Sequence, residues 1–313
     1  MGAIPDDMPH RRMTAARCPA TLRVLALGAL LAIAGLGLAG CSAIGAFNAV
    51  ASGDAGSELA ASDIAYGEHP RQRLDVYAPA KRGASMPVVF FIYGGSWDSG
   101  SRSDYAFAGR ALAAQGYVTV VADYRLVPEV LFPDFLDDNA RALRWLAGNV
   151  SRFGGDPGRV ALVGHSAGAY NAMMLALDAR YLRRAGVAAS SIKAVVALSG
   201  PYDFFPFTSP AARAAMGKAP DPLQTQPVTF ARSGAPPMFL AHGLDDTTVN
   251  PRNTATMAAR LRSRGAIVTE RRYPGLDHAD TLLAIPQFTR AKRQAVFDDM
   301  MRFLGEHIPA AQR

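Results

Sequence analysis

The stretch that decides the fold is Val160-Ala-Leu-Val-Gly-His-Ser-Ala-Gly-Ala-Tyr170. Its apolar run Val160–Val163 predicts a buried strand, and residues 167–179 predict a helix because apolar side chains recur there at helical spacing. The residues between them, 164–168, match the pattern G-x-S-x-G. A strand joined to a helix by so sharp a turn indicates a nucleophile elbow, in which a strained backbone exposes the hydroxyl of Ser166. The alternative is an ordinary strand-to-helix turn with a serine N-cap.

The composition is that of a globular protein with ample material for a core. The chain has 313 residues, of which 50% are hydrophobic and 19% are charged. The net charge is +7, and residues 1–40 contribute four Arg and two Asp to it. No run of Lys and Arg is interleaved with aromatic residues, so we expect no nucleic-acid partner.

Residues 1–40 have the features of an export signal, with Arg side chains followed by an apolar run. The run ends in Leu38-Ala-Gly-Cys41, which resembles the bacterial lipoprotein box, where cleavage precedes the Cys and its sulfur carries a diacylglycerol. We therefore expect a signal peptide over 1–40, a lipid on Cys41 and a place in the cell envelope, facing outside the cytoplasm and anchored to a bacterial membrane. The alternative is an uncleaved transmembrane anchor. Residues 41–62, rich in Ala, Ser and Gly, predict a flexible tether, and 63–313 a single catalytic domain.

Strands alternate with helices through the rest of the chain. The pattern predicts strands at 73–79, 87–93, 117–122, 160–163, 192–198, 238–241 and 266–273, and helices at 104–115, 132–150, 167–179, 254–264 and 288–307. Most of these strands are apolar on both faces, which is typical of an α/β fold with a mostly parallel central sheet and helices on both faces. The Pro-rich segment 199–237 interrupts the alternation, and we expect it to form a small partial cap.

A serine nucleophile needs a base, and the base needs an orienting acid. In an open parallel sheet such groups lie beyond the carboxyl ends of the strands. His278 follows the strand 266–273 in a glycine-containing loop and is the predicted base. The strand 238–241 runs into Asp245 and Asp246, either of which could be the acid, and the spacing His-Gly-x-x-Asp-x-x-Val favours Asp246.

The tetrahedral oxyanion of such a reaction needs preorganised donors. We assign the backbone N–H groups of Ala167 and Gly95, with Ser96 as a third candidate, because the loop after the strand 87–93 is rich in small residues. The aromatic residues near these positions are either pocket walls or ordinary core and cap packing. The candidates for the substrate pocket are Trp97, Tyr170, Phe204 and Phe207.

Taken together, these motifs resemble the α/β-hydrolase superfamily, in the branch of hormone-sensitive-lipase-like, feruloyl-esterase and kynurenine-formamidase-like enzymes. The resemblance covers about residues 70–305 and rests on Gly94-Gly95-Ser96-Trp97, Asp123-Tyr124-Arg125-Leu126, Gly154-Gly155-Asp156-Pro157, Gly164-His165-Ser166-Ala167-Gly168, His242-Gly243 with Asp246, and His278. One departure is Tyr93, which stands where the oxyanion motif of the family usually begins with His.

The resemblance implies a serine carboxylic-ester hydrolase, without a cofactor, that acts on small or medium acyl esters through an acyl-enzyme. We see no paired His or Cys at ligand spacing and expect no metal. Two alternatives stay open. One is hydrolysis of an amide, such as an arylformamide, and the other is a catalytically silent lipoprotein that binds a partner.

Overall fold

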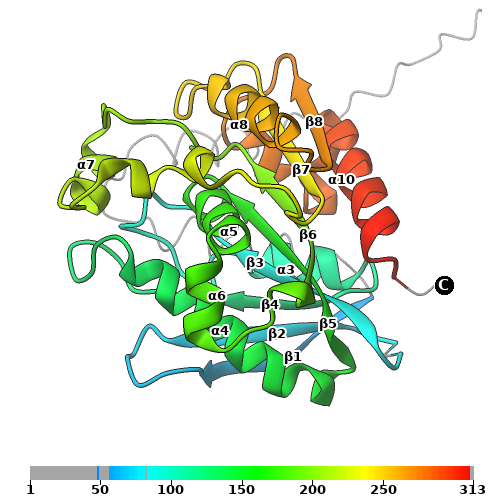
Figure 1. The fold of residues 1–313 in the computed structure, drawn as a ribbon. Helices are drawn as coiled ribbons and strands as arrows, with labels where there is room; N and C mark the ends of the chain where they lie inside the picture. The colour runs from blue at the N-terminus through cyan, green and yellow to red at the C-terminus, as the bar shows by residue number, and fades with distance from the viewer. Residues whose placement is uncertain (1–47, 49–55, 82, 311–313) are drawn as a thin grey trace, which may run out of the picture. The chain divides into compact units, whose positions relative to one another are not determined.

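Eight strands form one sheet in the order β1-β2-β4-β3-β5-β6-β7-β8 (Figure 1). The computed structural model describes residue 48, residues 56–81 and residues 83–310, all within one structural unit. The strands are β1 (Ser57–Ala65), β2 (Arg73–Pro79), β3 (Met86–Ile92), β4 (Val118–Ala122), β5 (Gly155–His165), β6 (Ile192–Leu198), β7 (Met238–Gly243) and β8 (Val268–Tyr273). β1 and β2 pair antiparallel, and the strands from β4 to β8 in the sheet order are mutually parallel, which confirms the mostly parallel sheet.

Helices cover both faces of this sheet, as predicted. The α-helices are α3 (Ala106–Ala113), α4 (Asp134–Asn149), α5 (Ala167–Leu177), α6 (Ala179–Ala185), α7 (Pro210–Met216), α8 (Arg252–Arg262), α9 (Asp280–Leu283) and α10 (Gln294–His307). α4, α5 and α6 pack together on one face, and α3 and α10 lie on the other (Figure 1). Among the described residues, no helix has the length and apolarity needed to cross a membrane.

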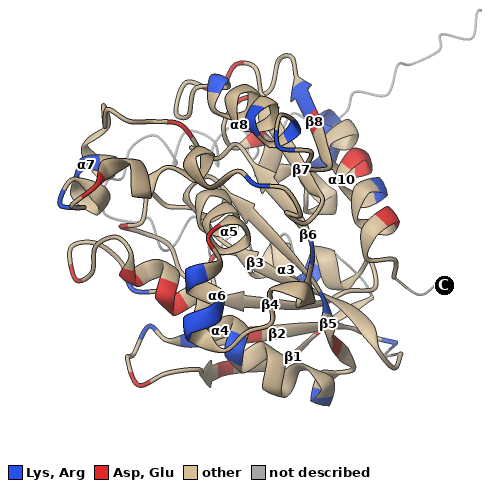
Figure 2. Cartoon of the chain, viewed as in Figure 1, with Lys and Arg blue, Asp and Glu red and all other residues tan. Residues whose placement is uncertain are grey.

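Two of the inner strands, β3 and β4, are buried along their whole length because they are covered on both sides. Every residue of β3 and of β4 is buried, which is why β3 is a continuous apolar run and β4 is apolar apart from Thr119. Charged side chains lie mainly on the helices and loops around the sheet, with both signs interspersed (Figure 2). The final helix begins later than predicted, since Gln287–Arg293 form a 3-10 helix before α10.

The boundary of the predicted tether needs a correction. Residues 57–62 belong to β1, which pairs with β2 at the edge of the sheet. β1 is half exposed and has only one neighbouring strand, so its sequence lacks the apolar signal of the central strands. The predicted signal peptide 1–40 and Cys41 lie outside the described residues.

Asn48 makes a long-range contact with the start of α3. Its Nδ2 donates to the carbonyl oxygens of Ser103 and Asp104, at 2.7 and 2.9 Å. Its Oδ1 accepts from the N–H of Phe107 at 3.1 Å. No side chain of the helix's own N-cap residue, Tyr105, caps α3. The side chain of Asn48 therefore serves as the cap from a distant part of the chain.

The segment between β6 and β7 forms the predicted partial cap. It contains α7 and two short 3-10 helices rather than one long element. Asn253 of α8 fixes its beginning, because Asn253 Oδ1 accepts from the N–H groups of both Tyr202 and Asp203 at 2.8 Å. The cap is thereby joined to the loop and helix that follow β7.

Candidate active site

The turn between β5 and α5 has the geometry of a nucleophile elbow. Ser166 adopts φ 55° and ψ −124°, a strained conformation for a residue with a side chain. A Cβ on Gly164 would lie 2.4 Å from the carbonyl oxygen of Gly168, and one on Gly168 would lie 1.9 Å from that of Ile92. Glycine is therefore required on both sides of Ser166, whose half-buried side chain stays accessible between buried neighbours.

The predicted serine, histidine and acid meet at the carboxyl ends of β5, β8 and β7. His278 Nε2 lies 2.9 Å from Ser166 Oγ, and His278 Nδ1 lies 2.7 Å from Asp246 Oδ2. Asp245 is exposed and contributes only its backbone N–H, which donates to Leu276. The structure thus places Asp246, and not Asp245, beside the imidazole.

Asp246 is held as an anion by its surroundings. Burial alone would raise its pKa, but hydrogen bonds from His242 and His278 hold that pKa well below the usual range. Its Oδ1 accepts from the N–H groups of Thr248 and Val249, at 2.9 and 2.8 Å. The ionised carboxylate accepts the Nδ1–H of His278, so Nε2 is left to accept the hydroxyl proton of Ser166.

A second histidine lies on the same carboxylate oxygen. His242 Nε2 is 3.0 Å from Asp246 Oδ2 and 2.9 Å from the carbonyl oxygen of Val249. Because both partners are acceptors, Nε2 carries the hydrogen. His242 Nδ1 then accepts from the hydroxyl of Thr254, at 2.7 Å. His242 of β7 and Thr254 of α8 are both fully buried. Asp246 is therefore held in place by these two elements as well as by its own loop.

A third histidine, His165, supports the loop that carries His278. Its Nε2 donates to the carbonyl oxygen of His278 at 2.9 Å, and the two rings lie 4.8 Å apart. Burial, and then the neighbouring His278 ring, lower the pKa of His165 to about 3. His165 is therefore neutral near pH 7. From the sequence, His242 is expected to hold the loop that carries the acid, and its bonds to Asp246 and Val249 agree with this. His165 has no role in the site on sequence grounds, because its partner comes from a distant part of the chain.

The loop after β3 supplies the predicted oxyanion donors. Gly95 adopts φ +108°, where a Cβ would lie 2.3 Å from the carbonyl oxygen of Ser99. A Cβ on Gly94 would lie 3.0 Å from the Cβ of Ser166, so the loop passes directly against the nucleophile. Within the described part of the chain, the backbone N–H groups of Gly95, Ser96 and Ala167 have no hydrogen-bond acceptor. They are the free donors that a developing oxyanion requires.

A cavity of about 810 Å³ opens at Ser166. One wall comes from the cap and is mostly apolar, and another comes from the β7–α8 loop and is mostly polar. Its lining includes Ser96, Trp97, Ala167, Phe204, Phe205, Pro206, Thr247, Thr248, Asn250 and Arg252. Volume and lining are those of a site for a small organic ligand.

Two of the four aromatic residues predicted for the pocket line it, and two do not. Trp97 and Phe204 face the cavity. Tyr170 is completely buried behind them, with ring centroids 5.2 Å from Trp97 and 5.9 Å from Phe204. Phe207 packs on Phe204 at 5.7 Å from inside the cap. Tyr170 and Phe207 are therefore packing residues, as the alternative had it. For Tyr170 on α5, helical spacing alone could not distinguish a pocket wall from the layer of side chains behind it.

The arrangement combines a nucleophile, a base, an orienting carboxylate and oxyanion donors at one cavity. These groups suit attack on a carbonyl carbon followed by transfer of the acyl group. In the part of the chain that the structure describes, no three His, Cys, Asp or Glu side chains gather in a way that could hold a metal.

Comparison with curated proteins gives matches over most of this chain. An isoprenylcysteine alpha-carbonyl methylesterase from Arabidopsis thaliana is 30% identical over 259 residues, which are 76% of this chain and 60% of that protein. A probable carboxylic ester hydrolase from Mycobacterium tuberculosis, LipM, is 32% identical over 220 residues, 64% of this chain and 51% of that protein. The chain thus spans about 50 to 60% of the length of these relatives.

Solved structures show the fold. Esterase B from Lactobacillus rhamnosis, determined with a tributyrin phosphonate, has a TM-score of 0.72 at 22% identity, covering 92% of this chain and 96% of that one. Esterase 2 from Thermogutta terrifontis, determined with butyrate, has a TM-score of 0.67 at 22% identity, covering 83% and 98%. The expected α/β-hydrolase fold is confirmed.

A protein-family model matches as well, and it gives the family. The model, described as BD-FAE, aligns with residues 74–261 and so covers more than half of the chain, from β2 to the end of α8. The aligned region contains the elbow, Asp246 and the oxyanion loop, which is formed by residues 93–102. His278 follows beyond the aligned region. The match covers more than half of the chain and includes both the elbow and Asp246. The chain therefore belongs to the BD-FAE family.

Proposed function

We propose that this protein is a serine carboxylic-ester hydrolase that acts on small or medium acyl esters through an acyl-enzyme. The observation that carries the proposal is the unbroken line of hydrogen bonds from Ser166 through His278 to Asp246, at 2.9 and 2.7 Å, beside a cavity that Ser166 lines. The relatives named as a methylesterase and a carboxylic ester hydrolase support an ester as the substrate.

In the proposed reaction Ser166 Oγ attacks the ester carbonyl carbon while its proton passes to His278 Nε2. The N–H groups of Gly95, Ser96 and Ala167 stabilise the oxyanion of the tetrahedral intermediate. The intermediate collapses as His278 returns the proton to the leaving alcohol, which leaves the acyl group on Ser166. Water, deprotonated by His278, then repeats the sequence and releases the carboxylic acid.

The surroundings of His278 suit this proton transfer. His278 becomes positively charged in each tetrahedral intermediate, next to the anion of Asp246 and the ring of His165. Because its low pKa keeps His165 neutral, that ring fixes the loop without opposing the new charge. The cavity next to Ser166 offers the apolar wall of Trp97 and Phe204 to an acyl or alcohol group.

Hydrolysis of p-nitrophenyl esters, from acetate to octanoate, tests the proposal. We expect Ser166→Ala to lower kcat by about 10⁴- to 10⁶-fold, while Ser151→Ala, at an exposed serine outside the cavity, leaves it unchanged. A fluorophosphonate should label the protein at Ser166. Wild-type hydrolysis by Ser166→Ala would refute the assignment. A panel that pairs each ester with the amide of the same acyl group, and that includes an arylformamide, distinguishes ester from amide hydrolysis. A folded protein that neither hydrolyses nor labels would be a silent binder.

We further propose that Cys41 carries a lipid and holds the enzyme in the cell envelope, outside the cytoplasm. The support is the sequence alone, an export signal that ends in Leu38-Ala-Gly-Cys41. Metabolic labelling of the full chain with a palmitate analogue should mark the wild type and Cys18→Ala but not Cys41→Ala. The labelled protein should sediment with membranes. A label that survives in Cys41→Ala would contradict the proposal.

A further inference from the structure

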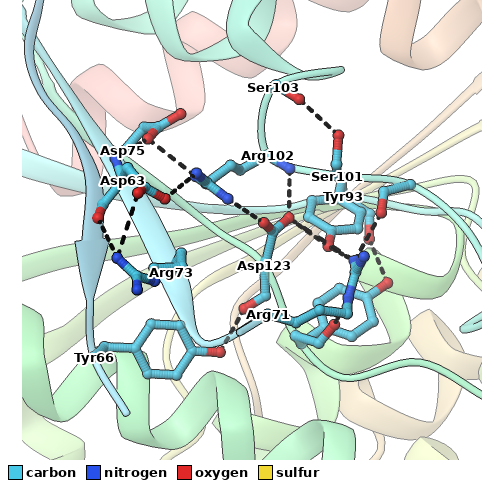
Figure 3. Close-up of polar contacts among 12 residues, drawn as sticks. Asp63, Tyr66, Arg71, Arg73, Asp75, Tyr93, Ser101, Arg102, Ser103 and Asp123 are labelled. Carbon is cyan, nitrogen blue, oxygen red and sulfur yellow. Dashed lines mark hydrogen bonds and ion pairs between the residues drawn. The ribbon is translucent and has the colours of Figure 1, made fainter. Parts of the chain in front are cut away.

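A cluster of charged side chains lies behind the oxyanion loop, residues 93–102, and joins it to the edge of the sheet (Figure 3). It contains three arginines and three aspartates, and the mechanism above uses none of them. The members are Asp63, Arg71, Arg73, Asp75, Arg102 and Asp123. Asp123 is the innermost, only 4% exposed, and follows the end of β4.

The carboxylate of Asp123 bonds to both ends of the oxyanion loop. Its Oδ1 accepts from the hydroxyl of Tyr93 at 2.9 Å and from the backbone N–H of Arg102 at 2.5 Å. Its Oδ2 accepts from the Arg102 guanidinium at 2.5 Å. Tyr93 directly precedes Gly94 and Gly95, and Arg102 ends the loop. One side chain therefore closes the loop at its base, as Figure 3 shows.

Arg71 and Tyr124 reinforce this closure from the other side of Tyr93. Arg71 Nη2 donates to the hydroxyl of Tyr93 at 2.9 Å and to the carbonyl oxygen of Gly100 at 2.8 Å. The hydroxyl of Tyr124 donates to the carbonyl oxygen of Tyr93 at 3.1 Å, and their rings stack at 4.8 Å. Burial raises the pKa of Tyr93 well above its usual value, so the phenol stays neutral and donates to Asp123.

The charged cluster also ties the oxyanion loop to the sheet. The Arg102 guanidinium reaches Asp75 of β2 at 3.1 Å and Asp63 of β1 at 2.6 Å, in addition to Asp123. The loop is thus tied to β1, β2 and β4 at once. Tyr93, which stands where the oxyanion motif of the family usually begins with His, places its phenol oxygen between Arg71 and Asp123.

We propose that Asp123 is a positioning residue for the oxyanion hole, which fixes the N–H groups of Gly95 and Ser96 by holding both ends of the loop 93–102. The inference rests on the proposed ester hydrolysis. It follows from the way oxyanion donors work, because they must be in place before charge develops on the substrate. A displacement of about 1 Å at such a site costs about 10²-fold in rate.

The test compares Asp123→Asn with the wild type, using an ester and a boronic acid or trifluoromethyl ketone as tetrahedral analogue. We expect kcat to fall about 10- to 10²-fold with KM nearly unchanged, and the inhibition constant of the analogue to rise by the same factor. Both quantities depend on the oxyanion donors, whereas KM does not. Tyr93→Phe keeps the stacking and removes the two bonds of the hydroxyl, to Asp123 and from Arg71, but it leaves both bonds between Arg102 and Asp123. It should therefore show a smaller loss in the same direction.

The matched control is Asp138→Asn. Asp138 is as buried as Asp123 and pairs with Arg125 and Gln72, but it bonds to neither end of the loop. The Asp138→Asn variant should be less stable to denaturant, with no change in kcat or in binding of the tetrahedral analogue. If Asp123→Asn behaves in the same way, Asp123 is a structural ion pair and the inference is wrong. A folded wild type that hydrolyses no ester would refute the proposed function and this inference with it.

Discussion

The two halves of the site are held by different kinds of side chain. Around Ser166, His278 and Asp246, the supporting groups are the buried imidazoles of His165 and His242. Around the oxyanion loop, the supporting groups are arginines and aspartates in contact with one another. Both halves have to be rigid, but only the first has a residue that gains and loses a proton.

This difference follows from what each half does. A fixed cation beside His278 would oppose the positive charge that the base acquires, whereas a neutral imidazole supplies an N–H donor without that cost. The oxyanion loop contributes backbone N–H groups, and its charged supports are paired with one another behind it. Charge can therefore stabilise the loop, because the charged groups there are paired with partners of opposite sign. The next three predictions test this division, beginning with the largest effect.

The first prediction concerns the half of the site that transfers protons, namely Ser166, His278 and Asp246. Its activity should depend most strongly on the charge of Asp246. We expect Asp246→Asn to lower kcat by about 10⁴-fold, because an amide can no longer hold His278 with Nε2 free to accept a proton. The measurement is ester hydrolysis at neutral pH. Asp245→Asn is the control, since Asp245 is exposed and contributes only its backbone. Equal losses in the two variants would contradict the assignment of the acid.

The second prediction concerns the donor that His242 supplies to Asp246. His242→Leu removes the Nε2–H that lies 3.0 Å from Asp246 Oδ2 and should lower kcat by about 10²-fold, because the carboxylate and the imidazole lose their alignment. His242→Gln retains an N–H donor at a similar reach and should recover most of the rate. If Leu and Gln lose the same activity, His242 serves packing rather than the alignment of Asp246.

The third prediction uses the neutrality of His165. Its folded pKa of about 3 lies below the unfolded value of 6.5, so as the pH falls the unfolded chain takes up the proton first. Stability from this residue is therefore complete above about pH 6.5 and declines toward pH 3, by about 1.4 kcal/mol per pH unit. Urea unfolding at pH 7 and pH 5 should show the wild type losing about 2 kcal/mol more than His165→Gln. If the free energy of unfolding of the two proteins changes equally between pH 7 and pH 5, His165 takes up its proton in the folded state as readily as in the unfolded chain. That outcome would contradict the prediction.

The proton-transfer half could be located from the sequence because its signals are local. Ser166, Asp246 and His278 each follow a predicted strand within a few residues, and parallel strands bring their carboxyl ends to one edge. The elbow glycines could be predicted for the same reason, since the contacts that exclude a Cβ lie within the turn itself or on the neighbouring strand. The mostly apolar strands, which alternate with helices along the chain, indicated the class of the sheet.

The supports of the oxyanion loop could not be predicted because their contacts join distant parts of the chain. Asp123 lies in a recognisable motif, yet nothing near it in the sequence points to Tyr93 or Arg102. Asp138 shows the limit of periodicity. Its position on α4 belongs to the polar face of the helix, but Arg125 and Gln72 cover it completely. Charged residues that pair across the fold are misread as solvated ones.

The contact between Asn48 and α3 has a geometric consequence. Asn48 is seven residues after Cys41, and seven residues span at most about 25 Å even when fully extended. With a lipid on Cys41, the start of α3 could not leave the bilayer surface by more than that reach. The proposed lipid and the cap of α3 would then be joined by one short segment, and the catalytic domain would have little freedom to move away from the membrane.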